Sequence, residues 1–169
     1  MIKIKKLSKG FTLLEMIVAV GLFIVVAIIS LGTLLNISDV QRKTGALRSI
    51  NDNINFSLET MVREIRSGSN YSSPSQSVFT MTNNIGESVT YRLNNNRIER
   101  SVSGNPYVVL TAQEVTINNL KFIVSGQLAG DSLQPSVTIS INGIAGSEKE
   151  KTKAILKLQT TVTQRKLDS

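Results

Sequence analysis

An uninterrupted apolar run near the N-terminus constrains this chain more than any other feature. From Met16 to Ser38 the sequence contains no charged side chain. As an α-helix with a rise of about 1.5 Å per residue, this run would extend roughly 34 Å. That length is enough to cross the hydrocarbon core of a bilayer, which is about 30 Å thick. The run therefore predicts a membrane-spanning helix at the start of the chain.

The residues before the run are basic. They contain no acid and four lysines: Lys3, Lys5, Lys6 and Lys9. Positive charge before a membrane segment favours a cytoplasmic N-terminus, which would place the residues after Ser38 outside the cytoplasm. The run is also longer than the apolar core of a secretory signal peptide, about 7 to 15 residues, and no A-x-A-like cleavage site ends it. We expect a single-pass protein of the cell (inner) membrane.

One carboxylate, Glu15, directly precedes the run. A charge in or near the hydrocarbon region costs about 2.5–3.5 kcal/mol on insertion scales and needs a partner. The sequence offers only the basic leader, or a positive charge brought by another molecule. In the alternative interpretation, Glu15 lies solvated among the lipid headgroups as the end of an ordinary anchor.

The stretch Lys-Gly-Phe-Thr-Leu-Leu-Glu at residues 9–15 resembles the prepilin cleavage and methylation motif of type IV pilins and pseudopilins. The resemblance implies cleavage between Gly10 and Phe11 by a prepilin peptidase, and N-methylation of Phe11. It also implies that Glu15 pairs with the N-terminal amine of a neighbouring subunit during filament assembly. The implied partners are the peptidase, other pilin or pseudopilin subunits, an inner-membrane assembly platform, and membrane lipid before assembly.

The chemistry of these residues is consistent with that resemblance. Cleavage after Gly10 would create an ammonium group on Phe11, about one helical turn from Glu15, and a pair of opposite charges is less costly to bury than one charge alone. A glycine before the cut would let a protease approach the backbone closely. Replacing Glu15 should therefore leave cleavage intact but impair assembly.

A single long helix is predicted for the first part of the chain. The first proline is Pro74, so no proline interrupts the preceding residues. After the apolar run, apolar residues recur at spacings of three and four, the pattern of one helical face: Leu47, Ile50, Ile54, Leu58, Met61 and Ile65. We expect a helix from Thr12 to Arg66 whose first half lies in lipid or in a filament core. Its second half would pack on a folded domain, as the pilin resemblance also implies.

The residues after this helix predict a small β-rich domain. Turn-forming residues dominate 67–77, which indicates a linker. Apolar and polar residues alternate before and after Asn94, Asn95 and Asn96, which predicts a hairpin with its turn at the asparagines. Further strands are expected at 78–82, 107–110, 120–125, 137–141 and 153–163. The fold class is therefore α+β, with a long N-terminal helix on a mostly antiparallel sheet.

The predicted organisation has five parts. They are a leader that is removed (1–10), a transmembrane or filament-core helix (11–38), the amphipathic half of the same helix (39–66), a linker (67–77) and a β-rich outer domain (78–169).

Composition leaves little basis for enzymatic chemistry. The chain has no histidine and no cysteine, so imidazole bases, thiolate nucleophiles and ordinary transition-metal sites are excluded. Ser147 with Lys149 is a weak candidate for a dyad. Weak candidates for calcium ligands are Asp131, which stands alone, and the pair Glu148 and Glu150, which is flanked by lysines. We expect no catalytic residue, no metal and no cofactor.

The net charge gives no strong nucleic-acid signal. The formal charge is +7, and without the four leader lysines 15 basic and 12 acidic residues leave +3. Arg92, Arg97 and Arg100 gather on the predicted hairpin, but Glu99 dilutes them. A nucleic-acid face would need a larger clustered excess of basic residues.

The expected function is a structural subunit of a type IV pilus-like or type II secretion pseudopilus filament. Val-Gly-Leu-Phe at 20–23 and Met-Val-Arg-Glu-Ile-Arg at 61–66 are similar to the J-like or W-like minor pseudopilins. Two alternatives stay open. One is a tip binding module of a competence or adhesion pilus that contacts DNA or a surface, and the other is a signal-anchored protein that is never cleaved.

Overall fold

The fold was obtained as a computed structural model, which describes residues 10–127, 133–146 and 152–165. The chain divides into two compact units, Met1–Val40 and Gln41–Ser169. A single helix, α1 (Leu13–Ser67), contributes residues to both units. The observed bounds agree closely with the helix expected from Thr12 to Arg66.

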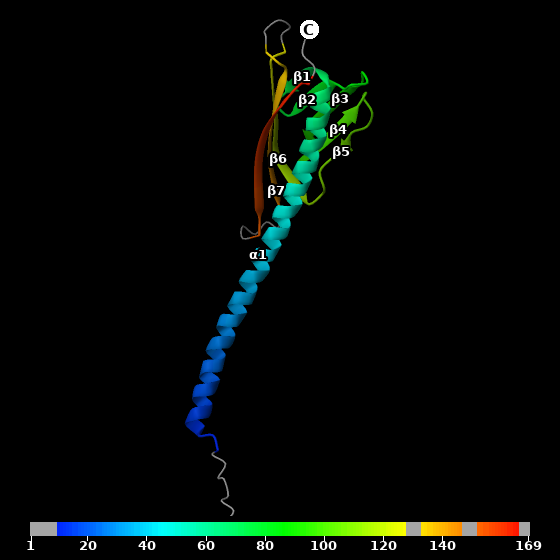
Figure 1. The fold of residues 1–169 in the computed structure, drawn as a ribbon. Helices are drawn as coiled ribbons and strands as arrows, with labels where there is room; N and C mark the ends of the chain where they lie inside the picture. The colour runs from blue at the N-terminus through cyan, green and yellow to red at the C-terminus, as the bar shows by residue number, and fades with distance from the viewer. Residues whose placement is uncertain (1–9, 128–132, 147–151, 166–169) are drawn as a thin grey trace, which may run out of the picture. The chain divides into compact units, whose positions relative to one another are not determined.

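The second unit contains two antiparallel sheets. In the first sheet the strand order is β1 (Ser69–Ser75), β2 (Val78–Thr82), β3 (Ser88–Asn94), β4 (Arg97–Val102) and β5 (Val108–Val109). In the second it is β6 (Val115–Ser125), β7 (Ser136–Ala145) and β8 (Ala154–Thr163). Figure 1 shows the last part of α1, coloured cyan to green, lying along these strands. The α+β arrangement predicted from the sequence is confirmed.

The hydrophobic core lies between the second half of α1 and the two sheets. Ile50, Ile54, Met61 and Ile65 of the helix are fully buried there. At Gly143 of β7 an added Cβ would lie only 3.1–3.3 Å from side-chain carbons of Ile54, Ile117 and Ile50. The glycine therefore allows the helix to approach the sheet closely.

The predicted helical face is slightly displaced in the structure. Leu47 was expected on the buried face, but its side chain is exposed, and Ala46 is buried instead. Ser57 is also buried, and its hydroxyl donates to the Asn53 carbonyl oxygen at 2.9 Å. Ala46 is small, and the Ser57 hydroxyl is hydrogen-bonded within the helix, so both can be buried on the face of α1 that packs on the sheets. The spacing of large apolar residues did not predict their burial.

The hairpin predicted around three asparagines is present as β3 and β4. Asn94 pairs with Arg97, so Asn95 and Asn96 form the two-residue turn. Both have positive φ, 47° and 60°. This is the geometry of a type I′ turn, which asparagine tolerates better than most residues.

The segment 67–77, expected as a linker, is mostly strand β1. Tyr71 explains the difference, because its ring is buried and its hydroxyl donates to the Ile65 carbonyl oxygen at 2.6 Å, at the end of α1. Pro74 is compatible with this strand because β1 lies at a sheet edge. The serine-rich composition concealed a strand that Tyr71 holds against the helix end.

Candidate functional site

The N-terminus of α1 contains the three residues singled out in the sequence. Gly10 and Phe11 precede the helix, and Phe11 is 72% exposed. An added Cβ at Gly10 would meet no atom within 4 Å, and Gly10 is not among the glycines with positive φ. Nothing among the described residues therefore requires a glycine at position 10. Residues 1–9 lie outside the described residues.

Glu15 has a local role that the sequence analysis missed. The Thr12 hydroxyl accepts the Glu15 backbone N–H at 3.2 Å, and a Glu15 carboxylate oxygen accepts the Thr12 backbone N–H at 3.4 Å. This reciprocal pair is a capping box, for which Thr-x-x-Glu is the sequence signature. The capping box does not test the expectation that a positive charge from the leader or from another molecule pairs with Glu15. The bonds are long, and neither brings a positively charged partner to the carboxylate.

The apolar part of α1 is exposed on all sides. No residue is buried in its most apolar 18-residue window, and large side chains from Leu13 to Val40 are at least half exposed. The hydroxyls within it are satisfied locally, since Ser30 and Thr33 donate to the Val26 and Ile29 carbonyl oxygens. A helix that is apolar all round needs an apolar environment. This segment is long and apolar enough to cross a membrane.

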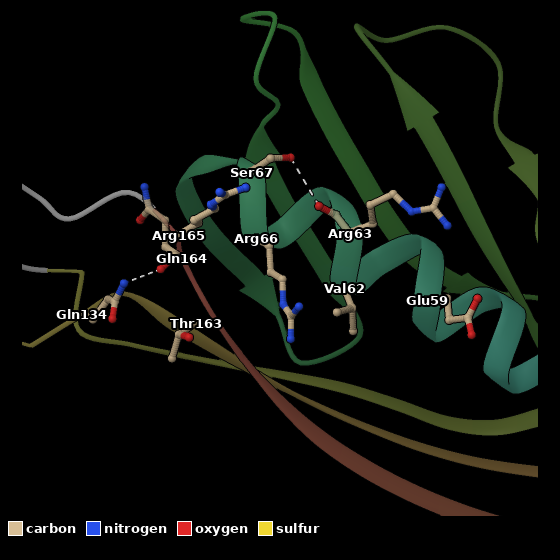
Figure 2. Close-up of a pocket in the computed structure, with 9 residues that line it drawn as sticks. All are labelled: Glu59, Val62, Arg63, Arg66, Ser67, Gln134, Thr163, Gln164 and Arg165. Atoms are coloured by element: carbon tan, nitrogen blue, oxygen red, sulfur yellow. Dashed lines mark hydrogen bonds between the residues drawn. The ribbon is translucent and has the colours of Figure 1, made fainter.

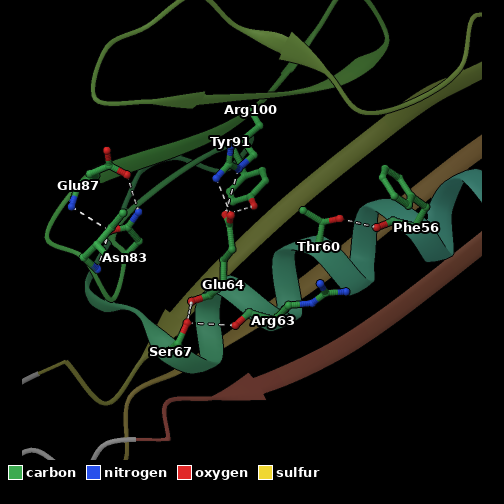
Figure 3. A network of polar contacts seen from close by, with 10 residues as sticks. Phe56, Thr60, Arg63, Glu64, Ser67, Asn83, Glu87, Tyr91 and Arg100 are labelled. Carbon is green, nitrogen blue, oxygen red and sulfur yellow. Dashed lines mark hydrogen bonds and ion pairs between the residues drawn. The ribbon is translucent and has the colours of Figure 1, made fainter.

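A second carboxylate of α1, Glu64, is held by two residues of the first sheet (Figure 3). The Tyr91 hydroxyl of β3 donates to one carboxylate oxygen, and Arg100 of β4 donates to both, at 3.1 Å from Nε and 2.5 Å from Nη2. Burial, together with the Glu64 carboxylate, raises the pKa of Tyr91 well above its ordinary value. Hydrogen bonding to Glu64 raises the pKa of Arg100. This cluster joins the helix to the sheet.

The three hairpin arginines do not form a free basic patch. Arg100 is bound to Glu64, and Arg92 makes an ion pair with Glu99 at 2.8 Å. The Arg92 guanidinium also lies 3.5 Å from the centre of the Tyr107 ring, within the range of a cation–π contact. Of the three, only Arg97 has no ion-pair partner within the described part of the chain.

A groove of about 890 Å³ lies at the end of α1, beside the end of β8. Figure 2 shows Arg66 projecting from the helix beside Val62, and Arg165 extending toward the last helical turn. Arg63 also lines the groove, and Glu59 is the acidic residue among the described lining residues. The Arg165 backbone N–H donates to the Arg66 carbonyl oxygen at 2.9 Å. The sequence analysis did not identify this basic groove, because its arginines come from distant segments.

Within the described residues no group of three or more acidic side chains could hold a metal ion. The weak candidates Asp131, Ser147, Glu148, Lys149 and Glu150 lie outside those residues. The structure consequently leaves two regions of interest, the start of α1 and the groove beside β8.

Comparison of the chain with protein-family models, with curated proteins and with solved structures finds no match.

Proposed function

We propose that this chain is a structural subunit of a pilin-like filament, of the type IV pilus or type II secretion pseudopilus class. In this proposal a prepilin peptidase cleaves after Gly10 and the amine of Phe11 is methylated. The chain then leaves the membrane and packs its apolar helix against those of other subunits. Two short stretches, 20–23 and 61–66, also resemble the J-like or W-like minor pseudopilins.

The segment from Gly10 to Val40 carries the proposal. It combines the Lys-Gly-Phe-Thr-Leu-Leu-Glu motif with an apolar helix whose large hydrophobic side chains are at least half exposed. Lipid can cover such a helix before assembly, and neighbouring helices can cover it afterwards. In both environments only a helix satisfies its own backbone hydrogen bonds.

The properties of Gly10 and Glu15 support the same proposal. Gly10 has open space around it and no strained backbone angle, so the reason for a glycine there would lie in a molecule that acts on the chain. Glu15 caps the helix, but a carboxylate near lipid still lacks a positive partner. The ammonium of Phe11 on a cleaved neighbouring subunit would supply one.

The tip-binding alternative has less support. The hairpin does not supply the exposed basic or aromatic patch that it would need, because two of the three hairpin arginines are engaged within the chain. The groove at the end of α1 gathers three arginines beside Glu59, which is a small cluster and not the domain-wide basic excess of a nucleic-acid face. We therefore do not propose nucleic-acid binding.

The direct test is the intact mass of the protein isolated from its native membranes. The proposal predicts loss of residues 1–10 and the addition of one methyl group at Phe11. The Gly10→Arg variant should accumulate as full-length precursor, because a large side chain beside the cut would block the peptidase. An intact Met1 end on the wild-type protein would instead identify an uncleaved signal anchor and refute the proposal.

A further inference from the structure

The last strand, β8, leaves one edge of the second sheet open. The sheet order is β6, β7, β8, so among the described residues β8 pairs on one side only. Its register with β7 runs from Ser136–Thr163 to Ala145–Ala154 without a shift. An unbroken strand at a sheet edge presents a row of unpaired N–H and C=O groups, to which another strand can bind.

The hydrogen-bond pattern identifies which residues face outward. In antiparallel pairs, residues bonded to the partner strand alternate with residues whose backbone groups point away. The Gln164 N–H donates to the Pro135 carbonyl oxygen, so the even-numbered residues of β8 bond to β7. The outward-facing residues are Ile155, Lys157, Gln159, Thr161 and Thr163.

The other sheet edges are blocked, and this makes β8 different. Strand β1 contains Pro74 and two register shifts, and β5 has only two residues. The outer edge of β6 bonds to loops of the first sheet, through the amides of Ile117 and Phe122. Proline, bulges, short length and charged side chains are the usual protections against strand addition, and of these β8 has only the single charge of Lys157.

The open edge leads into the basic groove. Thr163, the last outward-facing residue of β8, lines this groove together with Arg63, Arg66 and Arg165. A strand bound along β8 would therefore bring one of its ends to a groove whose charged lining, among the described residues, is three arginines and one glutamate. Charge complementarity favours an acidic end at that position.

The same charges disfavour a second copy of this chain. In the antiparallel arrangement that pairs all five outward-facing residues, Lys153 of the second copy would lie opposite Arg165. A parallel arrangement would bring a second Arg165 to the same groove. Like charges directly opposite each other destabilise strand pairing.

We propose that β8 and the adjoining groove bind an extended segment of a different polypeptide, which adds as a fourth strand to the second sheet and places an acidic end among Arg63, Arg66 and Arg165. Backbone hydrogen bonds would supply much of the affinity, and the arginines would select the occupant. The edge would accept such a segment whether or not the chain assembles into a filament.

Amide hydrogen exchange on the full-length chain in detergent micelles tests this proposal. The probe is an acetylated peptide, Glu-Glu-Thr-Val-Thr-Val-Thr-Val-Thr, whose N-terminal glutamates would reach the groove in an antiparallel arrangement. A matched peptide carries two lysines in place of the glutamates. The acidic peptide should slow exchange of the odd-numbered β8 amides at least about tenfold and bind about tenfold more tightly than the basic peptide.

Two sets of variants locate the binding. Thr161→Pro should abolish protection by the peptide while the even-numbered amides stay protected, because the proline removes only an outward-facing N–H. Thr161→Val is the matched control and should bind normally. The double variant Arg66→Gln, Arg165→Gln should bind the acidic peptide about three- to tenfold more weakly.

Three results would overturn the proposal. Absence of protection by millimolar acidic peptide would remove the strand-binding site, and equal affinity for the two peptides would remove the role of the arginines. Protection of the odd-numbered amides that rises with protein concentration, without peptide, would assign the edge to a second copy.

Discussion

Two of the carboxylates of helix α1, Glu15 and Glu64, differ in their surroundings. Glu64 is bound by Tyr91 and Arg100 of its own chain, whereas within the described residues Glu15 has only the weak capping contact with Thr12. The helix differs around the two carboxylates as well. Apolar side chains near Glu64 pack on the sheets, whereas those near Glu15 are exposed. The second half of α1 thus completes a folded domain, while the first half exposes an apolar surface that calls for an apolar environment.

The largest expected effect on the free energy of unfolding comes from the different packing of the two halves of α1. Ile54→Ala should lower the free energy of unfolding of the second unit by about 2–5 kcal/mol, because it removes buried methyl groups and leaves a cavity. Ile24→Ala, at an exposed position of the apolar half, should leave that value unchanged. Denaturant unfolding in detergent measures both. Similar losses in the two variants would erase the distinction.

The Glu64 cluster should have the next largest effect. Glu64→Gln leaves the half-buried Arg100 without its charged partner and should cost about 1–2 kcal/mol, a value reduced for partial exposure. Glu59→Gln, on the exposed face of the same helix, is the matched control and should change stability by less than about 0.5 kcal/mol. If the two variants were equally stable, the cluster would not hold the helix on the sheet.

The same cluster predicts a pH dependence. Folding raises the pKa of Tyr91 above its value in the unfolded chain, which is about 10. The contribution of Tyr91 to the free energy of unfolding is therefore complete below about pH 10 and decreases as the pH rises above it. The free energy of unfolding of the wild-type protein should therefore fall more steeply above pH 10 than that of the Tyr91→Phe variant, because phenylalanine has no hydroxyl to ionise. Unfolding of both proteins between pH 8 and 11 provides the comparison, and parallel curves would contradict the assigned environment of Tyr91.

The smallest effect concerns a glycine in the packed half of the helix. An added Cβ at Gly45 would meet nothing within 4 Å, so Gly45→Ala should stabilise the helix by about 0.5–1 kcal/mol. At Gly143 the same change should destabilise by about 1–3 kcal/mol, because Ile50, Ile54 and Ile117 surround that position. Thermal unfolding of the two variants should shift in opposite directions.

Local patterns in the sequence predicted much of this fold. The spacing of apolar residues predicted α1 to within one residue at each end, and the asparagines predicted the turn between β3 and β4. Strand β1 was missed because its serines resemble a loop, and its composition does not show its pairing with β2 or the burial of Tyr71 against the end of α1.

The candidate sites divide in the same way. The Thr12–Glu15 capping box has a local signature and could have been found in the sequence. The Glu64–Arg100 ion pair joins residues far apart in the chain, and the groove brings Arg66 beside Arg165. Such contacts depend on the tertiary fold, and no spacing of residues in the sequence predicts them.

The measurement that most directly tests the central claim uses Glu15→Gln. Glutamine can still serve in a capping box, but it carries no charge for an ammonium group to pair with. The account predicts that this variant is cleaved after Gly10 yet largely absent from filaments sheared from cells and collected by sedimentation. Thr12→Ala, which loses the cap and keeps the charge, should assemble. Normal amounts of Glu15→Gln in the filament fraction would contradict the claim that Glu15 finds its partner in another subunit.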